Sequence, residues 1–96
     1  MEKDYLKSAD NFFDIILKLK SREDCYRLFD DICTIKEIKD LAQRLEIAQM
    51  LQDGKSYKAV SELTGASTAT VGRVSKCLSY GSGGYEMALA LLNEDK

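Results

Sequence analysis

Apolar residues recur at intervals of three and four positions along most of this chain, which is the spacing of one face of an α-helix. Between residues 4 and 20 this face consists of Tyr5, Ala9, Phe12, Phe13, Ile16 and Leu19. Ser21 can cap a second helix, because its hydroxyl can accept a hydrogen bond from a backbone N–H of the first turn. The apolar positions of that helix are Cys25, Leu28, Phe29 and Ile32. The chain is therefore predicted to begin with two amphipathic helices.

A longer third helix is predicted to begin after Thr34. Thr34 and Glu37 have the spacing of a capping box, in which the two side chains satisfy backbone N–H groups of the first turn. The residues on the expected inner face are Ile35, Ile38, Leu41, Ala42, Leu45, Ala48 and Leu51. Gly54 should end this helix, because glycine readily adopts the left-handed conformation that follows many helices.

Residues 56 to 78 have the pattern of a helix-turn-helix. Ser56 and Ser67 are the expected N-caps of two short helices, and Gly65 lies at the sharp turn between them. The apolar residues expected to face inward are Val60, Leu63, Val71, Val74 and Leu78. Residues 79 to 84, rich in glycine and serine, are predicted to form a flexible joint.

A last helix is predicted over residues 85 to 93, and it is apolar on nearly all sides, so it must be buried. Because the chain has no proline and only six glycines, we expect an all-α protein of six helices, one domain over residues 1–96. The first two helices are more apolar than a small monomer requires. They could wrap a monomer core, but we favour a homodimer in which residues 1–53 supply the dimerisation helices.

The net charge of −2 argues at first against a nucleic-acid partner. Its distribution along the chain changes that interpretation. Residues 54 to 80 carry four basic side chains and one acidic one, whereas residues 1 to 53 carry nine basic and twelve acidic ones. The helix-turn-helix is therefore locally basic, and most of the acidic residues lie elsewhere.

Several classes of protein are excluded by what the sequence lacks. The three cysteines form no CxxC pair and there is no histidine, so we expect no metal site and interpret the cysteines as buried core residues. The absence of histidine, of a nucleophile elbow and of a phosphate-binding loop argues against an enzyme or a bound cofactor. No apolar run approaches the ~18 residues that span a bilayer, so we expect a soluble, cytoplasmic protein with no membrane partner.

The second helix of the helix-turn-helix begins with small and hydroxyl side chains, which can enter a DNA major groove without steric conflict. These candidate contacts are Ser67, Thr68, Ala69 and Thr70. Four basic residues are candidate partners of the DNA phosphates: Lys55, Lys58, Arg73 and Lys76. Gly72, inside this helix, costs about 1 kcal/mol relative to alanine, which suggests that another group approaches closely there.

A second candidate site is a cleft between Arg44, on the long helix, and Arg73, on the second helix of the helix-turn-helix. Two guanidinium groups facing one cleft would suit a carboxylate or a phosphate. Other arrangements remain open: Arg44 could pair with Glu37, with Asp40 or with an acidic residue of a neighbouring chain, and Arg73 could contact a DNA phosphate.

Residues 34 to 78 resemble the Trp repressor-related proteins, and most closely their YerC/YecD-like branch. The matching residues are Thr34, Leu41, Arg44, Gly54, Gly65, Ala66, Ala69, Thr70, Arg73, Ser75 and Leu78. The resemblance implies a Trp repressor-like fold of six helices per chain, an intertwined homodimer and binding to double-stranded DNA. It also implies that Arg44, Arg73 and Thr34 lie near a bound ligand, which in Trp repressor is tryptophan.

Two positions depart from the family pattern. Val74 stands where Trp repressor has a glycine that leaves room for the indole, and Gly72 replaces a threonine. Val74 therefore argues against tryptophan as the ligand, although the arginine pair could still hold an anionic group. The sequence supports three hypotheses: a homodimeric repressor on a palindromic operator, an effector-sensing regulator with a small anionic ligand, and a protein-interaction module that does not bind DNA.

Overall fold

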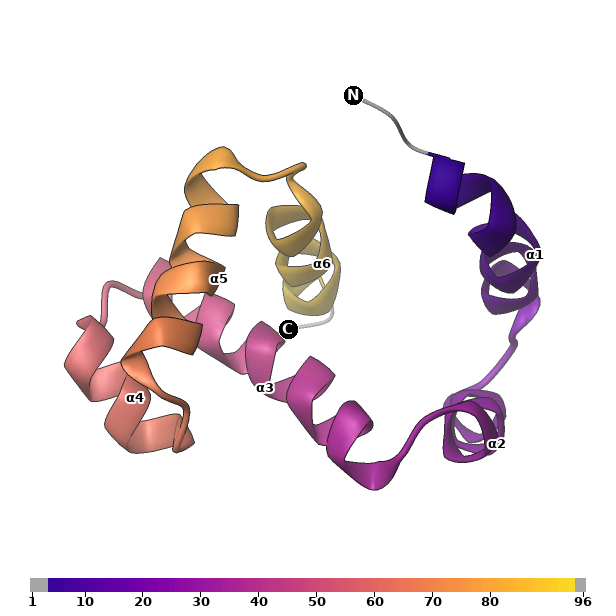
Figure 1. Cartoon of the computed structure of the whole chain (residues 1–96), viewed down its shortest axis with the longest axis horizontal. Helices are drawn as coiled ribbons and strands as arrows, with labels where there is room; N and C mark the ends of the chain where they lie inside the picture. Colours follow the sequence, from indigo (N-terminus) through magenta and orange to yellow (C-terminus); the bar gives the residue numbers. More distant parts are fainter. Residues whose placement is uncertain (1–3, 95–96) are drawn as a thin grey trace. The chain divides into compact units, whose positions relative to one another are not determined.

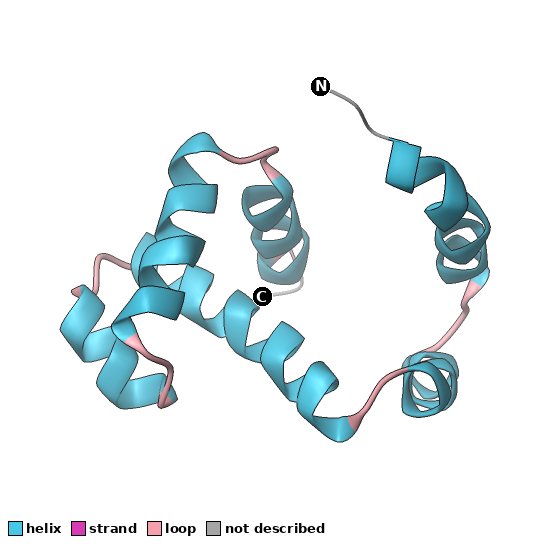
Figure 2. Ribbon diagram, viewed as in Figure 1, coloured by secondary structure: helices cyan, strands magenta, loops and turns pink. Residues whose placement is uncertain are grey.

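The computed structural model describes residues 4 to 94, which form six helices and no strand (Figures 1 and 2). The helices are α1 (Asp4–Lys18), α2 (Arg22–Ile32), α3 (Ile35–Gln52), α4 (Tyr57–Thr64), α5 (Thr68–Tyr80) and α6 (Gly84–Asn93). The predicted all-α fold of six helices is confirmed. The main differences at the boundaries are that α1 ends two residues before position 20 and that α5 continues to Tyr80, into the segment predicted to be a joint.

The caps and turns follow the sequence signals. Ser21 accepts a hydrogen bond from the backbone N–H of Asp24, and Ser56 accepts one from the backbone N–H of Ala59. Gly54, after α3, has a φ of 89°, the left-handed conformation that its position predicted. Local chemistry therefore determines where most of these helices begin and end.

The chain divides into two compact units, residues 1–36 and 37–96. In the described part of the first unit, α1 and α2 are joined by aromatic packing around Phe12. Its ring centroid lies 6.2 Å from that of Phe29 on α2 and 5.8 Å from that of Phe13 on α1. The first unit has no fully buried side chain among its described residues, so it has little core of its own.

The second unit contains the hydrophobic core. Helices α4, α5 and α6 gather around the C-terminal half of α3 (Figure 1). The buried core residues are Ile47, Ala48, Val60, Ala66, Val71, Val74 and Leu89. This confirms the predicted inward orientation of Ala48, Val60, Val71 and Val74. The core therefore holds the helix-turn-helix against α3 and α6.

Several predicted core positions are wrong for the single chain. On α3, Ile35 is 74% exposed, and Leu41, Ala42 and Leu45 are also exposed, because the other helices of its unit cover only its C-terminal half. Ile47 is fully buried although the predicted stripe omitted it.

On α4, Leu63 is 64% exposed. Three helical residues advance about 300° around the axis, so the side chains of Val60 and Leu63 diverge by roughly 60°. Only the side of α4 that carries Val60 meets the core.

The C-terminal helix and the cysteines also differ from expectation. On α6 only Leu89 is buried, whereas Met87, Leu91 and Leu92 are each more than half exposed. Cys25 and Cys77 are exposed and Cys33 is half-buried, so the prediction of buried cysteines is wrong. None of the described helices is both long enough and apolar enough to cross a membrane.

Candidate nucleic-acid interface and adjoining cleft

The turn between α4 and α5 is held by side-chain hydrogen bonds. The backbone N–H of Ala66 donates to the Thr64 hydroxyl oxygen over 3.2 Å, and that hydroxyl donates to the carbonyl of Val60 over 2.7 Å. The Ser61 hydroxyl donates to the carbonyl of Ala66 over 2.6 Å. Gly65 supplies the reversal with a φ of 79°. The angle between the two helices is therefore set by a short hydroxyl network.

Helix α3 contributes a hydrogen bond to this turn that sequence reasoning missed. The Gln43 amide Nε2 donates to the carbonyl of Thr64 over 3.1 Å. Gln43 is half-buried, and its partner is 21 positions away in the sequence, so no local pattern points to this hydrogen bond. It ties the end of α4 to the long helix.

The start of α5 has the geometry that its sequence predicted. The Ser67 hydroxyl oxygen accepts a hydrogen bond from the backbone N–H of Thr70 over 3.1 Å. The side chains of Ser67, Thr68 and Ala69 are exposed, and that of Thr70 is half-buried. The first turn of α5 is therefore an accessible tip made of small side chains on a capped helix.

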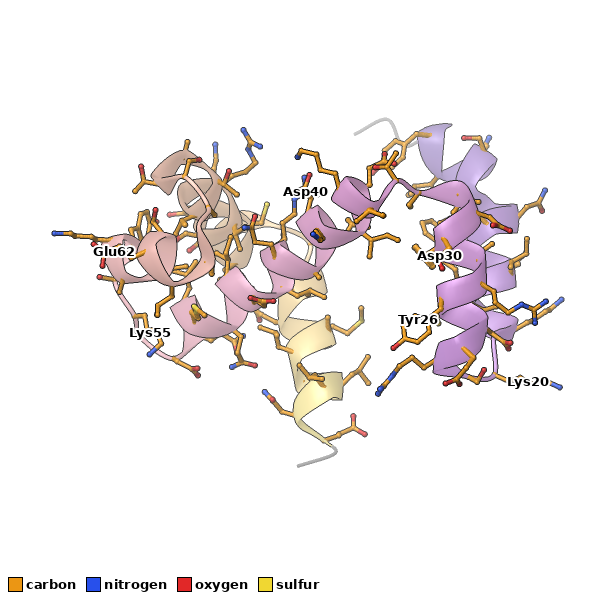
Figure 3. The ribbon with its side chains drawn as sticks, turned by 90° about the horizontal axis from the view of Figure 1, so that it is seen from below. Lys20, Tyr26, Asp30, Asp40, Lys55 and Glu62 are labelled. Atoms are coloured by element: carbon orange, nitrogen blue, oxygen red, sulfur yellow. The ribbon has the colours of Figure 1, made fainter. Side chains whose placement is uncertain are left out.

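The candidate phosphate contacts are exposed and come from separate segments. Lys55 precedes α4, Lys58 lies in its first turn, and Lys76 lies on α5. In Figure 3, Lys55 and the acidic Glu62 both extend outward from the segment that contains α4. Whether these lysines meet DNA phosphates stays a prediction.

Arg44 and Arg73 line the same cleft of about 320 Å³. The cleft is formed by α3, α5 and α6, and its lining residues are Arg44, Thr70, Arg73, Val74, Cys77 and Tyr85. Both arginine side chains are exposed, so the guanidinium groups are accessible to a ligand. Thr34, the third predicted ligand residue, belongs to the first unit and is also exposed. Binding of an anion by any of the three stays a prediction.

Tyr85 and Cys77 are cleft residues that the sequence analysis did not identify. Cys77 follows Arg73 by four positions, so helical spacing alone could have placed the two on one stripe of α5. Tyr85 comes from α6, and only the tertiary packing brings it to the cleft.

Tyr85 is also the residue whose ionisation the fold changes. Burial raises the pKa of the Tyr85 hydroxyl above its usual value, and nearby Cys77 adds to the increase. The positive charge of Arg44 acts in the opposite direction on the pKa of Tyr85, which means that this guanidinium lies close enough to affect the phenol electrostatically. Among residues 4 to 94, no three acidic, histidine or cysteine side chains converge as a metal site would require.

Comparison with known proteins agrees with these features. The sequence model of the Trp repressor protein family matches residues 7–93. The protein YerC of Bacillus subtilis (strain 168), whose function is uncharacterised, is 56% identical over 88 residues, which make up 92% of this chain and 85% of YerC.

Two solved structures have the same fold. A candidate Trp repressor from Staphylococcus aureus matches with a TM-score of 0.87 at 43% identity, and the match covers 97% of this chain and 95% of that one. A TrpR-like protein from Eubacterium eligens ATCC 27750 matches with a TM-score of 0.85 at 42% identity, over 91% and 90% of the two chains. The six helices therefore have the Trp repressor-like arrangement that the sequence predicted.

Proposed function

The chain belongs to the Trp repressor family, and on this premise we propose that it is a sequence-specific DNA-binding regulator of transcription. One observation carries the proposal: the capped and exposed tip of α5, held at a fixed angle to α4 by the hydroxyl network of the turn. A tip of small side chains lets the helix enter the major groove and approach base edges.

The regulator acts as a homodimeric repressor on a palindromic operator in the cytoplasm. A two-fold dimer presents two copies of α5, which enter successive major grooves about 34–36 Å apart. A dimer bound across the operator blocks access by other proteins, which favours repression over activation. Because the reading side chains are short, recognition uses contacts with thymine methyl groups and water-bridged hydrogen bonds more than bidentate pairs.

Exposed apolar side chains support the homodimer. They lie on α1, on the N-terminal half of α3 and on α6, and include Phe13, Ile15, Leu17, Ile35, Leu41, Met87, Leu91 and Leu92. A monomer rarely leaves so many large apolar side chains in water, and such surfaces mark interfaces between proteins. A second copy of the chain would cover them and complete the core that a domain of this size lacks.

The experiment that tests this function is selection of bound duplexes from random DNA by the purified protein. We expect an enriched sequence with two-fold symmetry. Thr70→Ala should reduce the preference for that sequence over random duplex, because Thr70 belongs to the reading tip. Lys58→Ala should weaken binding to both duplexes similarly, since phosphate contacts carry no sequence information.

The outcome that would reject DNA reading is the absence of any enriched sequence at low salt. That result would favour a protein-interaction module with the same fold. If Thr70→Ala lowers the affinity for both duplexes equally, base readout by Thr70 is rejected but DNA binding is not.

The cleft favours a second candidate function, effector sensing. Arg44 and Arg73 line one cavity together with Thr70, which belongs to the reading tip. An anionic effector bound between the two guanidinium groups would restrain α5 and so change its affinity for DNA. Val74 lines the same cavity and is buried in the core, so its branched side chain occupies fixed space there. The effector is therefore a small anion with no large flat ring.

A further inference from the structure

Gly72 makes a close contact within the chain. The Cβ of any residue placed there would lie 3.8 Å from the Cε2 atom of Tyr57, the first residue of α4. This is an ordinary van der Waals distance, so a methyl group would fit, whereas a longer side chain would push the ring aside. Because position 72 has no side chain, the tyrosine ring can lie against the second turn of α5.

The position of Gly72 on α5 relates this contact to the DNA interface. Ala69, Gly72 and Lys76 lie three and four positions apart, so they form one stripe along the helix. Ala69 belongs to the exposed reading tip, and Lys76 is an exposed candidate phosphate contact. The Tyr57 ring therefore covers the glycine between two candidate DNA contacts.

Tyr57 also lies between two basic residues in the sequence. Lys55 and Lys58 flank it in the sequence, and Ser56 caps α4 directly before it. Tyr57 is 46% exposed, so about half of the side chain is open to a partner.

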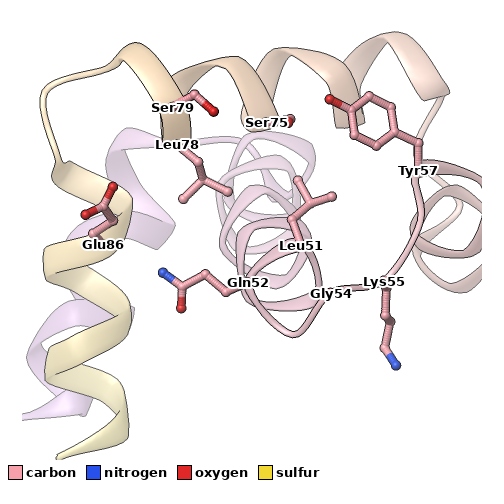
Figure 4. Close-up of a pocket in the computed structure, with 9 residues that line it drawn as sticks. All are labelled: Leu51, Gln52, Gly54, Lys55, Tyr57, Ser75, Leu78, Ser79 and Glu86. Atoms are coloured by element: carbon pink, nitrogen blue, oxygen red, sulfur yellow. The ribbon is translucent and has the colours of Figure 1, made fainter.

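The tyrosine hydroxyl lies in a polar part of the surface. Tyr57 lines one end of a cavity of about 610 Å³ between α3, α5 and α6, and its hydroxyl lies toward Ser75 (Figure 4). Ser75 immediately precedes Lys76. Glu86 lies at the other end of the same cavity (Figure 4). The Glu86 carboxylate disfavours an anion at its own end of the cavity, whereas the Tyr57 end is lined by no acidic residue.

We propose that Tyr57 is a further DNA contact, which donates its hydroxyl hydrogen to a backbone phosphate and is held in place by Gly72. This inference rests on the DNA-binding function proposed above. Tyrosine hydroxyls are common donors to DNA phosphates, and such contacts position a protein on the duplex without reading its sequence.

The test compares five proteins on the selected operator and on random duplex. Tyr57→Phe removes only the hydroxyl and keeps the ring against Gly72. We expect it to weaken binding to both duplexes by roughly 10- to 150-fold, the effect of losing one hydrogen bond to a charged group. The dependence of affinity on salt should not change, because tyrosine carries no charge to release a counterion. Tyr80→Phe is the matched control, because Tyr80 is 85% exposed at the far end of α5, and it should bind like the wild type.

Gly72→Val separates the role of the ring's position from that of the hydroxyl. The two added methyl groups displace the ring, so we expect weaker binding to both duplexes. In the Gly72→Val background, Tyr57→Phe should cause no further loss, because the hydroxyl has already left the phosphate. Thermal unfolding of each variant checks that a loss of binding does not reflect a loss of folded protein.

Three outcomes overturn the inference. If Tyr57→Phe binds both duplexes as the wild type does, Tyr57 is not a contact, and the proposed function stands. If the losses of binding free energy caused by Gly72→Val and Tyr57→Phe add fully in the double variant, the Gly72 contact does not position the hydroxyl. If the wild-type protein binds neither duplex at low salt, the proposed function fails and this inference fails with it.

Discussion

Ser67 and Thr70 are joined by two hydrogen bonds at the tip of α5. The backbone N–H of Thr70 donates to the Ser67 hydroxyl oxygen over 3.1 Å, and the Ser67 hydroxyl donates to the Thr70 hydroxyl oxygen over 3.1 Å. The first bond caps the helix, and the second fixes the orientation of the Thr70 side chain. The Thr70 hydroxyl hydrogen remains available to an acceptor outside the helix.

Ser67→Ala therefore has two separable effects. Loss of the cap should lower the free energy of unfolding by about 1 kcal/mol. Loss of the second bond should reduce preference for the operator over random duplex, because the Thr70 rotamer is no longer fixed. Urea unfolding and competition binding measure the two effects.

Ser21→Ala is the matched control. The Ser21 hydroxyl oxygen caps α2 by accepting a hydrogen bond of the same length, 3.1 Å, from the backbone N–H three residues later. It should cost similar stability and leave sequence preference unchanged. If both variants keep full sequence preference, the bond between the two hydroxyls has no part in recognition.

The proposed homodimer should dissociate when Phe13→Ser and Leu17→Ser are combined. The two residues are four positions apart on α1, and Leu17 is 81% exposed in the single chain. Replacing them removes apolar surface that a partner chain would bury. We expect the mass in sedimentation equilibrium to shift toward one chain. The melting temperature should fall, because a partner chain no longer stabilises the folded state.

Asp14→Ser with Lys18→Ser is the control for that pair. Both residues are exposed on the same helix, also four positions apart, and their charges cancel. This variant should sediment like the wild type. A wild-type protein that sediments as one chain at all concentrations would reject the homodimer.

The sequence predicted the helices well because their boundaries depend on local chemistry. Ser21, Ser56 and Ser67 all cap helices as expected, since capping involves residues only three positions apart. The turn at Gly65 was predictable for the same reason: it requires a backbone conformation that favours glycine.

Burial was predicted less well, because it depends on which elements cover each face. The apolar stripe of α3 was identified, but Ile35 and Leu41 are exposed in the single chain while Ile47 is fully buried. Periodicity shows that a face is apolar and cannot say which part of it a neighbouring helix covers. The cleft shows the same limit, since Tyr85 reaches it from a helix distant in the sequence.

Arg44→Ala tests whether the cleft senses an effector. Arg44 lies on α3, outside the helix-turn-helix, so removing its guanidinium should leave operator binding in buffer unchanged. If small carboxylates or inorganic phosphate raise the melting temperature of the wild-type protein, Arg44→Ala should reduce that increase. Thermal scans with each anion measure the effect at constant ionic strength. The sensor hypothesis fails if no anion stabilises the wild type more than it stabilises Arg44→Ala.

Between α5 and α6, alanine should be destabilising at Gly81 and tolerated at Gly84. A Cβ at Gly81 would collide with the carbonyl oxygen of Cys77, whereas one at Gly84 would meet nothing within 4 Å. Gly81→Ala should therefore lower the free energy of unfolding by about 1–3 kcal/mol, the usual range for forced overpacking. Gly84→Ala should be neutral or stabilising by up to about 1 kcal/mol, because alanine loses less backbone freedom on folding. Chemical unfolding measures the free energy of unfolding of both variants, and an equal decrease in the two would contradict this prediction.

The stability of the protein should depend on the ionisation of Tyr85 at alkaline pH. Burial raises the pKa of this hydroxyl above its ordinary value of 10.0, so the native state keeps the proton after the unfolded state has begun to lose it. The stability that Tyr85 contributes is fully present below pH 10 and is lost as the pH rises from there through the raised pKa. The unfolding free energy of the wild type should therefore fall more steeply in this range than that of Tyr85→Phe, as urea titrations at a series of pH values would measure.

Arg44→Ala should move the Tyr85 transition to still higher pH, because the Arg44 charge lowers the pKa of this tyrosine. Parallel pH profiles for the wild type and Tyr85→Phe would show that the cleft does not perturb the hydroxyl.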